Sequence, residues 1–495
     1  MVLVYIILSI YCIALLLILM YALAQLNLLI NYLSSRKNKE SIEVYDLSKP
    51  DEIPLVTIQL PVYNEMYVME RLLDNISRIE YPREKLEIQV LDDSTDETLG
   101  TTEAHIKRLQ QTGLDIKHVL RDNRKDFKAG ALREGLKTAK GEFIAIFDSD
   151  FLPQRDWLYK TVPYFKDEKI GVVQTRWGHL NRDYSLLTKV QAFALDAHFT
   201  LEQTGRNSKD HFINFNGTAG IWRKTCIEDA GNWHGDRLTE DLDLSYRAQL
   251  KNWKFKYLED VETPAELPVV ISAARTQQFR WNKGGAENFR KMLWQILKNK
   301  HTPFKTKIHG LLHLLNSTMF LSVLVVAVLS VPVLYIKNAH PELNGFFIAM
   351  SMFILSTIIF FICYWYMYRS TFGRGLKNFM NYIALFFTFF SVAMGFSLHN
   401  SVAVIEGHLG KRSAFIRTPK FNIKGEKGQW KGNKYLRSYL SANVILEGLL
   451  MIYFAFGIYS AFIVGTNGDF GFVPFHLMLV FGFGYVFFKS LGDKA

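Results

Sequence analysis

Two apolar segments enclose one polar segment, and this pattern limits what the chain can fold into more than any other feature. The first 34 residues and the stretch from 308 onward are rich in Leu, Phe, Ile and Val, whereas residues 35–307 carry charges of both signs. Val2 to Leu33 holds no charged side chain and exceeds the roughly 20 residues that a helix needs to cross a bilayer. We therefore expect membrane helices around one polar domain.

The apolar segments predict five membrane crossings, at residues 2–33, 309–336, 345–368, 441–464 and 471–489. Basic residues at 36, 37 and 39 follow the first crossing and mark the cytosolic side, so the polar domain is expected in the cytosol. The segment 379–396 is also apolar enough to span. A crossing there would place the basic stretch 411–437 outside, so we predict an interfacial or re-entrant helix instead.

This plan predicts six regions along the chain. They are an N-terminal transmembrane helix (1–34), a cytosolic domain (35–285), an interfacial amphipathic helix (286–307), two transmembrane helices (308–368), an interfacial helix with a basic loop (369–440) and two further transmembrane helices (441–495). The net charge of +11 arises mainly from Lys and Arg beside the apolar segments. That placement indicates contact with membrane lipids rather than with nucleic acid, in a bacterial inner membrane or a Golgi membrane.

Short β-rich segments alternate with helical segments between residues 55 and 260. Strands are expected at 55–60, 87–91, 116–120, 142–147, 170–175 and 254–258, and helices at 65–78, 97–111, 127–139 and 155–166. This alternation predicts an α/β fold with a mixed, mostly parallel, Rossmann-like sheet. Ligands bind beyond the carboxyl ends of such strands. The motifs PVYNE, DDST, RDN and DSD follow the first four strands, so their side chains are expected to share one site.

Carboxylates supply the first candidate site residues. Asp148 and Asp150 follow the apolar strand FIAIF, and two carboxylates so spaced suit a hard cation, Mg²⁺ or Mn²⁺, beside a diphosphate. Asp92 and Asp93 follow a second apolar strand, where at least one of them is expected to accept hydrogen bonds from a nucleobase or ribose. Lys128 opens a helix and is well placed for a phosphate.

A later acidic motif provides a candidate base. Asp241 of the TED motif is the residue that we expect to take a proton from an attacking hydroxyl, with Glu240 and Asp243 as rivals. Gln277, Arg280 and Trp281 lie within about one helical turn and can share a face. Arg280 offers charge to a diphosphate, and Trp281 offers a flat surface to a sugar ring.

The ordered motifs LPVYNE, LDDSTD, KAGAL, DSD, FNGTAG, TEDLDL and QQFRW resemble those of the family 2 membrane glycosyltransferases. The pattern is most similar to the cellulose synthase-like mannan and glucan synthases, densely over residues 52–300. The resemblance implies a GT-A fold, a divalent metal, and inverting transfer of a sugar from a nucleotide-sugar donor.

Carried onto this chain, the resemblance implies a role for each motif residue. Asp92 or Asp93 would contact the nucleotide, Asp148 and Asp150 the nucleotide and metal, and Asp241 would be the base. Gln277, Arg280 and Trp281 would serve the diphosphate and acceptor, Gly217 and Thr218 the acceptor, and Phe415, Thr418 and Lys420 would belong to a gating loop over the donor. This chain departs from the pattern at Asn216, where cellulose synthases carry Cys, and at Arg417, which replaces a Val. It also has only one span before the domain, and no cyclic-dinucleotide domain is expected after the last span.

The function predicted from these features is processive synthesis of a β-linked glucan or mannan from UDP-glucose or GDP-mannose, with the product passed across the membrane. A single-addition transferase acting on a lipid acceptor, as ceramide glucosyltransferases do, is the alternative enzyme. A non-catalytic transporter or scaffold is the alternative of another class. The sequence does not indicate any accessory subunit.

Overall fold

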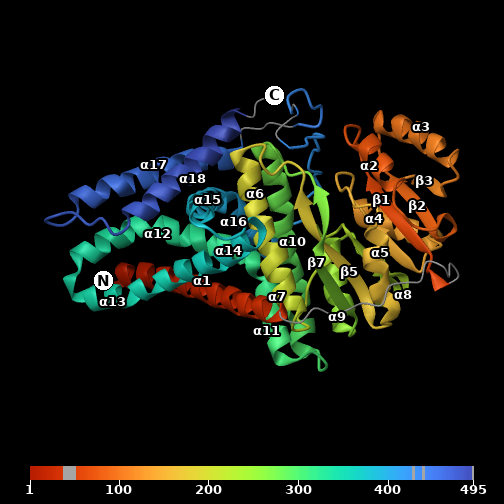
Figure 1. Ribbon diagram of the computed structural model, residues 1–495. Coiled ribbons are helices and arrows are strands. Elements are labelled where there is room, and N and C mark those ends of the chain that lie inside the picture. Colours follow the sequence, from red (N-terminus) through yellow and green to blue (C-terminus); the bar gives the residue numbers. More distant parts are fainter. Residues whose placement is uncertain (37–51, 426–427, 429, 437–440, 493–495) are drawn as a thin grey trace.

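The computed structural model describes residues 1–36, 52–425, 428, 430–436 and 441–492, and it shows two adjoining parts (Figure 1). One part is a β-sheet covered by helices, and the other is a set of long helices that extends away from it. Helices α6 (Leu186–Asp196) and α10 (Ile271–Lys298) stand between the two parts. The site between them is therefore built from both.

The sheet has seven described strands in the order β3-β2-β1-β4-β6-β5-β7. The strands are β1 (Val56–Val62), β2 (Leu86–Asp92), β3 (Ile116–Leu120), β4 (Phe143–Ile146), β5 (Ile170–His179), β6 (Gly220–Arg223) and β7 (Lys254–Ala265). Strand β6 runs antiparallel to both β4 and β5, whereas the other described pairs are parallel. The predicted mixed, mostly parallel sheet is confirmed, and β6 is the strand that the sequence analysis did not predict.

Alternate side chains of β4 enter the two faces of the sheet. Phe143 and Ala145 join one apolar cluster, Ile144 and Ile146 join the other, and all four are at most 2% exposed. A strand buried on both faces needs an uninterrupted apolar sequence, which FIAIF provides. Asp148 follows as soon as the strand leaves this core.

Short helices cover the sheet and connect its strands. They are α2 (Met69–Ile76), α3 (Thr98–Gln110), α4 (Phe127–Thr138), α5 (Trp157–Thr161), α7 (Thr204–Asn207), α8 (Lys224–Asp229) and α9 (Glu240–Leu250). The four helices expected at 65–78, 97–111, 127–139 and 155–166 all appear as α2 to α5, with shorter bounds. Helix α10 continues unbroken through residue 285, so the predicted domain boundary at that residue falls inside one helix.

Six segments among the described residues are long and apolar enough to cross a membrane, which supports an integral membrane protein. Their main helices are α1 (Val2–Ser35), α12 (Met319–Ala339), α14 (Ile354–Phe372), α15 (Leu376–Gly395), α17 (Ala442–Ile463) and α18 (Val473–Gly492), with α11 (Phe304–Leu314), α13 (Asn344–Met350) and α16 (Ser397–Leu409) beside them. Five crossings were expected, and α15 is the sixth segment. That it lies at the interface or re-enters the membrane stays a prediction.

Candidate active site

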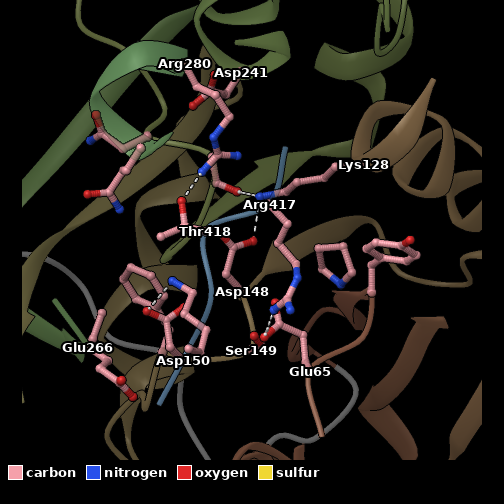
Figure 2. A pocket seen from close by; sticks show the side chains of 18 of the residues that line it. Glu65, Lys128, Asp148, Ser149, Asp150, Asp241, Glu266, Arg280, Arg417 and Thr418 are labelled. Carbon is pink, nitrogen blue, oxygen red and sulfur yellow. Dashed lines mark hydrogen bonds and ion pairs between the residues drawn. The ribbon is translucent and has the colours of Figure 1, made fainter. Parts of the chain in front are cut away.

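A cavity of about 180 Å³ lies at the carboxyl ends of β1, β2 and β4, against α10. Most of the residues singled out in the sequence line it together. These are Asp93, Lys128, Asp148, Asp150, Gly217, Asp241, Gln277, Arg280, Trp281, Thr418 and Lys420. Figure 2 shows Asp241 and Arg280 at one end of the cavity and Glu65, Asp150 and Glu266 at the other.

Two of the predicted residues, Asp92 and Thr218, lie beneath the cavity rather than in its wall. Asp92 is 2% exposed; its Oδ1 accepts a hydrogen bond from the Ser94 backbone N–H at 2.8 Å, and its Oδ2 lies 2.9 Å from His118 Nε2. The Thr218 hydroxyl accepts from the backbone N–H of Asp148 at 2.8 Å. Thr218 thus holds Asp148 in place. Of the predicted pair Asp92 and Asp93, only Asp93 lines the cavity, so only Asp93 can be proposed to contact a nucleotide.

A lysine faces each carboxylate of the predicted cation site. Asp148 Oδ1 lies 2.5 Å from Lys128 Nζ, and Asp150 Oδ2 lies 2.8 Å from Lys420 Nζ (Figure 2). The other oxygen of Asp150 is buried and has no hydrogen-bond partner among the described residues. A buried carboxylate oxygen without a partner is costly unless a ligand satisfies it, and hard cations prefer such oxygens.

These residues fit a divalent cation shared with a diphosphate. Asp148 and Asp150 would be its protein ligands, and no group of three or more His, Cys, Asp or Glu side chains able to hold a metal occurs among the described residues. Phosphate oxygens and water would have to complete the shell, as they commonly do for Mg²⁺.

The loop that carries Thr418 and Lys420 lies over the cavity. The Arg280 Nη2 donates a hydrogen bond to the Thr418 hydroxyl at 2.9 Å, and the Phe415 ring stacks on Phe127 with centroids 5.4 Å apart. Arg417, which departs from the family pattern, pairs with Glu65 at 2.6 Å. The loop therefore contacts both ends of the cavity through charged and aromatic side chains.

Ion pairs and hydrogen bonds fix this loop at its two ends. At its start, Lys283 of α10 pairs with Glu406 at 3.0 Å and donates a hydrogen bond to the Ser413 hydroxyl. At its end, the Glu266 carboxylate accepts hydrogen bonds from the backbone N–H groups of Phe421, at 2.8 Å, and Ile423, at 3.2 Å. The part between these attachments is the part that lines the cavity.

Asp241, the predicted base, lines the cavity beside Gly217. Its Oδ1 accepts a hydrogen bond from the Leu242 backbone N–H at 2.9 Å. Its Oδ2 lies 3.0 Å from the point where a Cβ on Gly217 would stand, and Gly217 has φ +78°. Glycine there supplies the backbone conformation and leaves room beside the carboxylate. Burial and the nearby Glu240 carboxylate raise the pKa of Asp241 to about 7.

The rival bases occupy different positions. Asp243 is fully buried outside the cavity and pairs with Arg247 at 2.7 Å and with Arg237, so it cannot reach a substrate. Glu240 lines the cavity beside Asp241, and burial raises its pKa as well. Of the three candidates, Asp241 and Glu240 line the cavity and Asp243 does not, so Asp241 stays the predicted base and Glu240 is the neighbouring charge that raises its pKa.

We expect the substitution Glu240→Gln to move the acidic limb of the pH profile toward lower pH by about 0.5–1 unit. Asp241 acts as a base only when ionised, so activity is lost as the pH falls through its pKa. Removing the Glu240 charge lowers that pKa. The profile of kcat/KM from pH 5.5 to 8.5 measures the shift, with Glu103→Gln on the exposed face of α3 as control. An unmoved limb, or one moved to higher pH, would contradict the coupling.

A second cavity, of about 380 Å³, continues from the first toward the membrane helices. Residues common to both walls include Trp177, Asn216, Asp241, Gln277 and Trp281. The far wall includes three aromatic side chains. They are Phe320 of α12, Phe389 of α15 and Phe396, which lies between α15 and α16. Trp281 is 38% exposed where the cavities meet, so its ring is open to a bound molecule.

Several lining residues were not predicted as site residues. Arg124 lies over the Tyr63 ring, 3.3 Å from its centroid, and Arg121 Nε donates to Asp93 Oδ1 at 2.8 Å, so the side of the cavity near Asp93 is rich in cations and rings. Glu65 also lines this side. The signal that points to Tyr63, Glu65 and Arg124 is their position: the first two lie in PVYNE and the third directly follows RDN, two polar motifs at strand ends.

Comparison with known proteins agrees with this geometry. Residues 54–284 match the family model described as glycosyltransferase like family 2. The probable glucomannan 4-beta-mannosyltransferase 4 of Oryza sativa subsp. japonica is 43% identical over 282 residues, covering 56% of this chain and 51% of that protein. Glucomannan 4-beta-mannosyltransferase 9 of Arabidopsis thaliana is 43% identical over 261 residues, covering 52% and 49%. The chain thus spans about half the length of these curated relatives.

A solved structure shows the same fold. The mannosyltransferase PcManGT from Pyrobaculum calidifontis, in complex with GDP-Man and Mn²⁺, superposes with a TM-score of 0.52 at 20% identity, covering 81% of this chain and all of that one. The resemblance to cellulose synthase-like mannan and glucan synthases that the motifs indicated is confirmed. Residues 54–284 of this chain are thus similar in sequence to the family 2 glycosyltransferases, and the fold is GT-A-like.

Proposed function

We propose that the protein is a processive, inverting glycosyltransferase that elongates a β-linked mannan or glucan from a nucleotide sugar and passes the product across the membrane. One observation carries the proposal: the carboxylate-lined cavity and the cavity that leads to the membrane helices join at Trp281 and Asp241. A donor in the first cavity and a growing chain in the second would meet beside the base.

The side chains support a single displacement at the sugar's anomeric carbon. Asp241 would take the proton of the acceptor hydroxyl, whose oxygen forms the new glycosidic bond as the bond to the diphosphate breaks. Arg280, Lys128 and Lys420 would stabilise the negative charge on the departing nucleoside diphosphate. A divalent cation held by Asp148 and Asp150 would supply further positive charge there.

GDP-mannose is the donor that the comparisons favour, with UDP-glucose as the competitor. The two plant relatives are described as mannosyltransferases, and the solved neighbour holds GDP-Man. The domain would work on the cytosolic side of a bacterial inner membrane or a Golgi membrane, because basic residues follow the first span.

A second candidate function is the addition of one sugar to a lipid. The observation in its favour is the apolar part of the second cavity, where Phe320, Phe389, Val392 and Phe396 could face an acyl chain as well as the apolar face of a sugar.

Radiolabelled GDP-mannose and UDP-glucose, supplied with Mg²⁺ or Mn²⁺ to vesicles that contain the protein, test the proposal. We expect label in a large glycan that resists chloroform extraction and gives a β-linkage on analysis. One labelled sugar on a chloroform-soluble lipid would support the second function instead. Absence of transfer from either donor, with the protein folded and nucleotide bound, would contradict both.

A further inference from the structure

A second segment of the chain, residues 430–436, packs against the loop that lies over the first cavity, and we call this segment the clasp. The side-chain amide of Asn433 donates a hydrogen bond to the Lys420 carbonyl at 2.9 Å. The Arg417 guanidinium lies over the Tyr435 ring, 4.5 Å from its centroid. Because Arg417 and Lys420 both line the cavity, the clasp contacts the cationic residues that the loop presents there.

The clasp is also attached to the start of α3. The Tyr435 hydroxyl donates a hydrogen bond to the Asp96 carboxylate, and Lys434 Nζ lies 3.1 Å from the same carboxylate. Lys434 pairs with the neighbouring Glu97 as well. Asp96 in turn accepts a hydrogen bond from the Thr98 backbone N–H at 3.0 Å. Its charge therefore lies at the N-terminus of α3, where the helix dipole stabilises an anion.

A further contact joins the clasp to the turn after β1. The Tyr67 and Tyr435 rings meet edge to face, with centroids 5.8 Å apart, and the Tyr67 hydroxyl accepts a hydrogen bond from the Lys434 backbone N–H at 3.4 Å. Tyr67 lies two residues after Glu65, which lines the cavity and pairs with Arg417 of the loop. The clasp thus connects the loop with two separate segments of the sheet domain.

The attachment of the clasp to α3 can open without disturbing the core. The side chains of Lys434 and Glu97 are 36% and 68% exposed, and that of Asp96 is 17% exposed. Ion pairs at such exposed positions are individually weak and are screened by salt. The two ends of the loop are attached instead to Lys283 and Glu266, whose side chains are 0% and 1% exposed. The clasp can therefore detach while both ends of the loop stay fixed.

We propose that Lys434 and Tyr435 are positioning residues for the donor. Bound to α3, they hold Arg417 and Lys420 of the loop over a nucleoside diphosphate sugar, and the spent nucleoside diphosphate leaves when the clasp detaches. Lys434 and Tyr435 do not line the cavity, so they act through the loop rather than on the donor itself. The inference rests on the proposed function, since the nucleotide of the donor is the ligand that the loop would retain.

Release of a fluorescent nucleotide from the protein in vesicles, followed by stopped flow, tests the assignment. The protein is loaded with Mn²⁺ and the N-methylanthraniloyl derivative of GDP or UDP, and excess unlabelled nucleotide is then added. We expect Tyr435→Phe, which loses only the hydroxyl, and Lys434→Gln each to raise the off-rate about fivefold, the effect of roughly one hydrogen bond or ion pair. The association rate should change less than about twofold, and the donor KM should rise without a fall in kcat.

Two further variants separate the clasp from a general effect of altered charge. Lys434→Arg keeps the positive charge and should restore the wild-type off-rate. Lys107→Gln is the matched control, because it breaks an exposed ion pair with Glu103 inside α3 and leaves the clasp intact. This control should release nucleotide at the wild-type rate.

A wild-type off-rate in either Tyr435→Phe or Lys434→Gln would overturn this inference and leave the proposed function standing. Affinity lost through slower association, with an unchanged off-rate, would also overturn it, because it would show a damaged site rather than earlier opening of the clasp. A wild-type protein that binds neither nucleotide would contradict the proposed function, and the inference with it. These outcomes are distinguishable because binding to the wild type is measured first.

Discussion

Asp241→Asn is expected to lower the rate of sugar transfer about 1,000-fold while nucleotide binding changes less than threefold, because a general base contributes roughly 10²–10⁴ to such reactions. The amide matches the carboxylate in shape and can keep the contact with the Leu242 backbone. It cannot accept the acceptor's proton. Initial rates with labelled donor give the first quantity, and titration with nucleoside diphosphate gives the second.

Asp229→Asn is the matched control for this substitution, since Asp229 ends α8 and lies outside both cavities. It should transfer sugar at the wild-type rate. Activity in Asp241→Asn close to that of the control would remove Asp241 as the base and leave Glu240, which lines the same wall, as the residue to test next.

The second large effect is expected at Asp150. Asp150→Asn should abolish tight Mn²⁺ binding and reduce transfer about 100-fold or more, because an amide lacks the charge that makes a carboxylate a strong ligand for a hard cation. Asp150 is 1% exposed and its Oδ1 has no partner among the described residues, so water cannot readily replace its contribution. Electron paramagnetic resonance of free Mn²⁺ measures the binding without any donor.

Lys420→Gln should have the opposite effect on the affinity for Mn²⁺. The lysine pairs with Asp150 at 2.8 Å, so its removal frees that carboxylate and should tighten binding of Mn²⁺ alone. Donor binding should weaken in the same variant, since a cation near the diphosphate is lost. Wild-type Mn²⁺ affinity in Asp150→Asn would show that the cation site lies elsewhere.

Hydrophobic pattern was sufficient to predict most of the sheet. Strand β3 was predicted at 116–120 and observed there, and β4 was predicted from FIAIF, because a strand buried on both faces leaves an apolar run that local sequence reveals. Strand β6 was missed because GIWR offers no apolar run comparable to FIAIF and is stabilised by antiparallel neighbours that lie far away in the sequence. Its existence depends on tertiary pairing.

The site was predictable where residues follow strands in order, and less so where partners come from distant segments. Asp148 and Asp150 were found from their position after β4. The choice between Asp92 and Asp93 depended on which side chain the sheet buries, and the contact of Arg417 with Glu65 joins residues more than 350 positions apart.

The loop over the cavity is attached at Ser413 and again at Phe421, and this fixes how far it can travel. The seven residues from 414 to 420 lie between these points. An extended residue spans at most about 3.5 Å and four such steps separate residue 417 from either attachment, so the midpoint can rise no more than about 14 Å. Under the proposed function, donor exchange would then need only a short movement of one small flap, which would have to break ion pairs such as Arg417–Glu65 while the rest of the enzyme stayed in place around a growing chain.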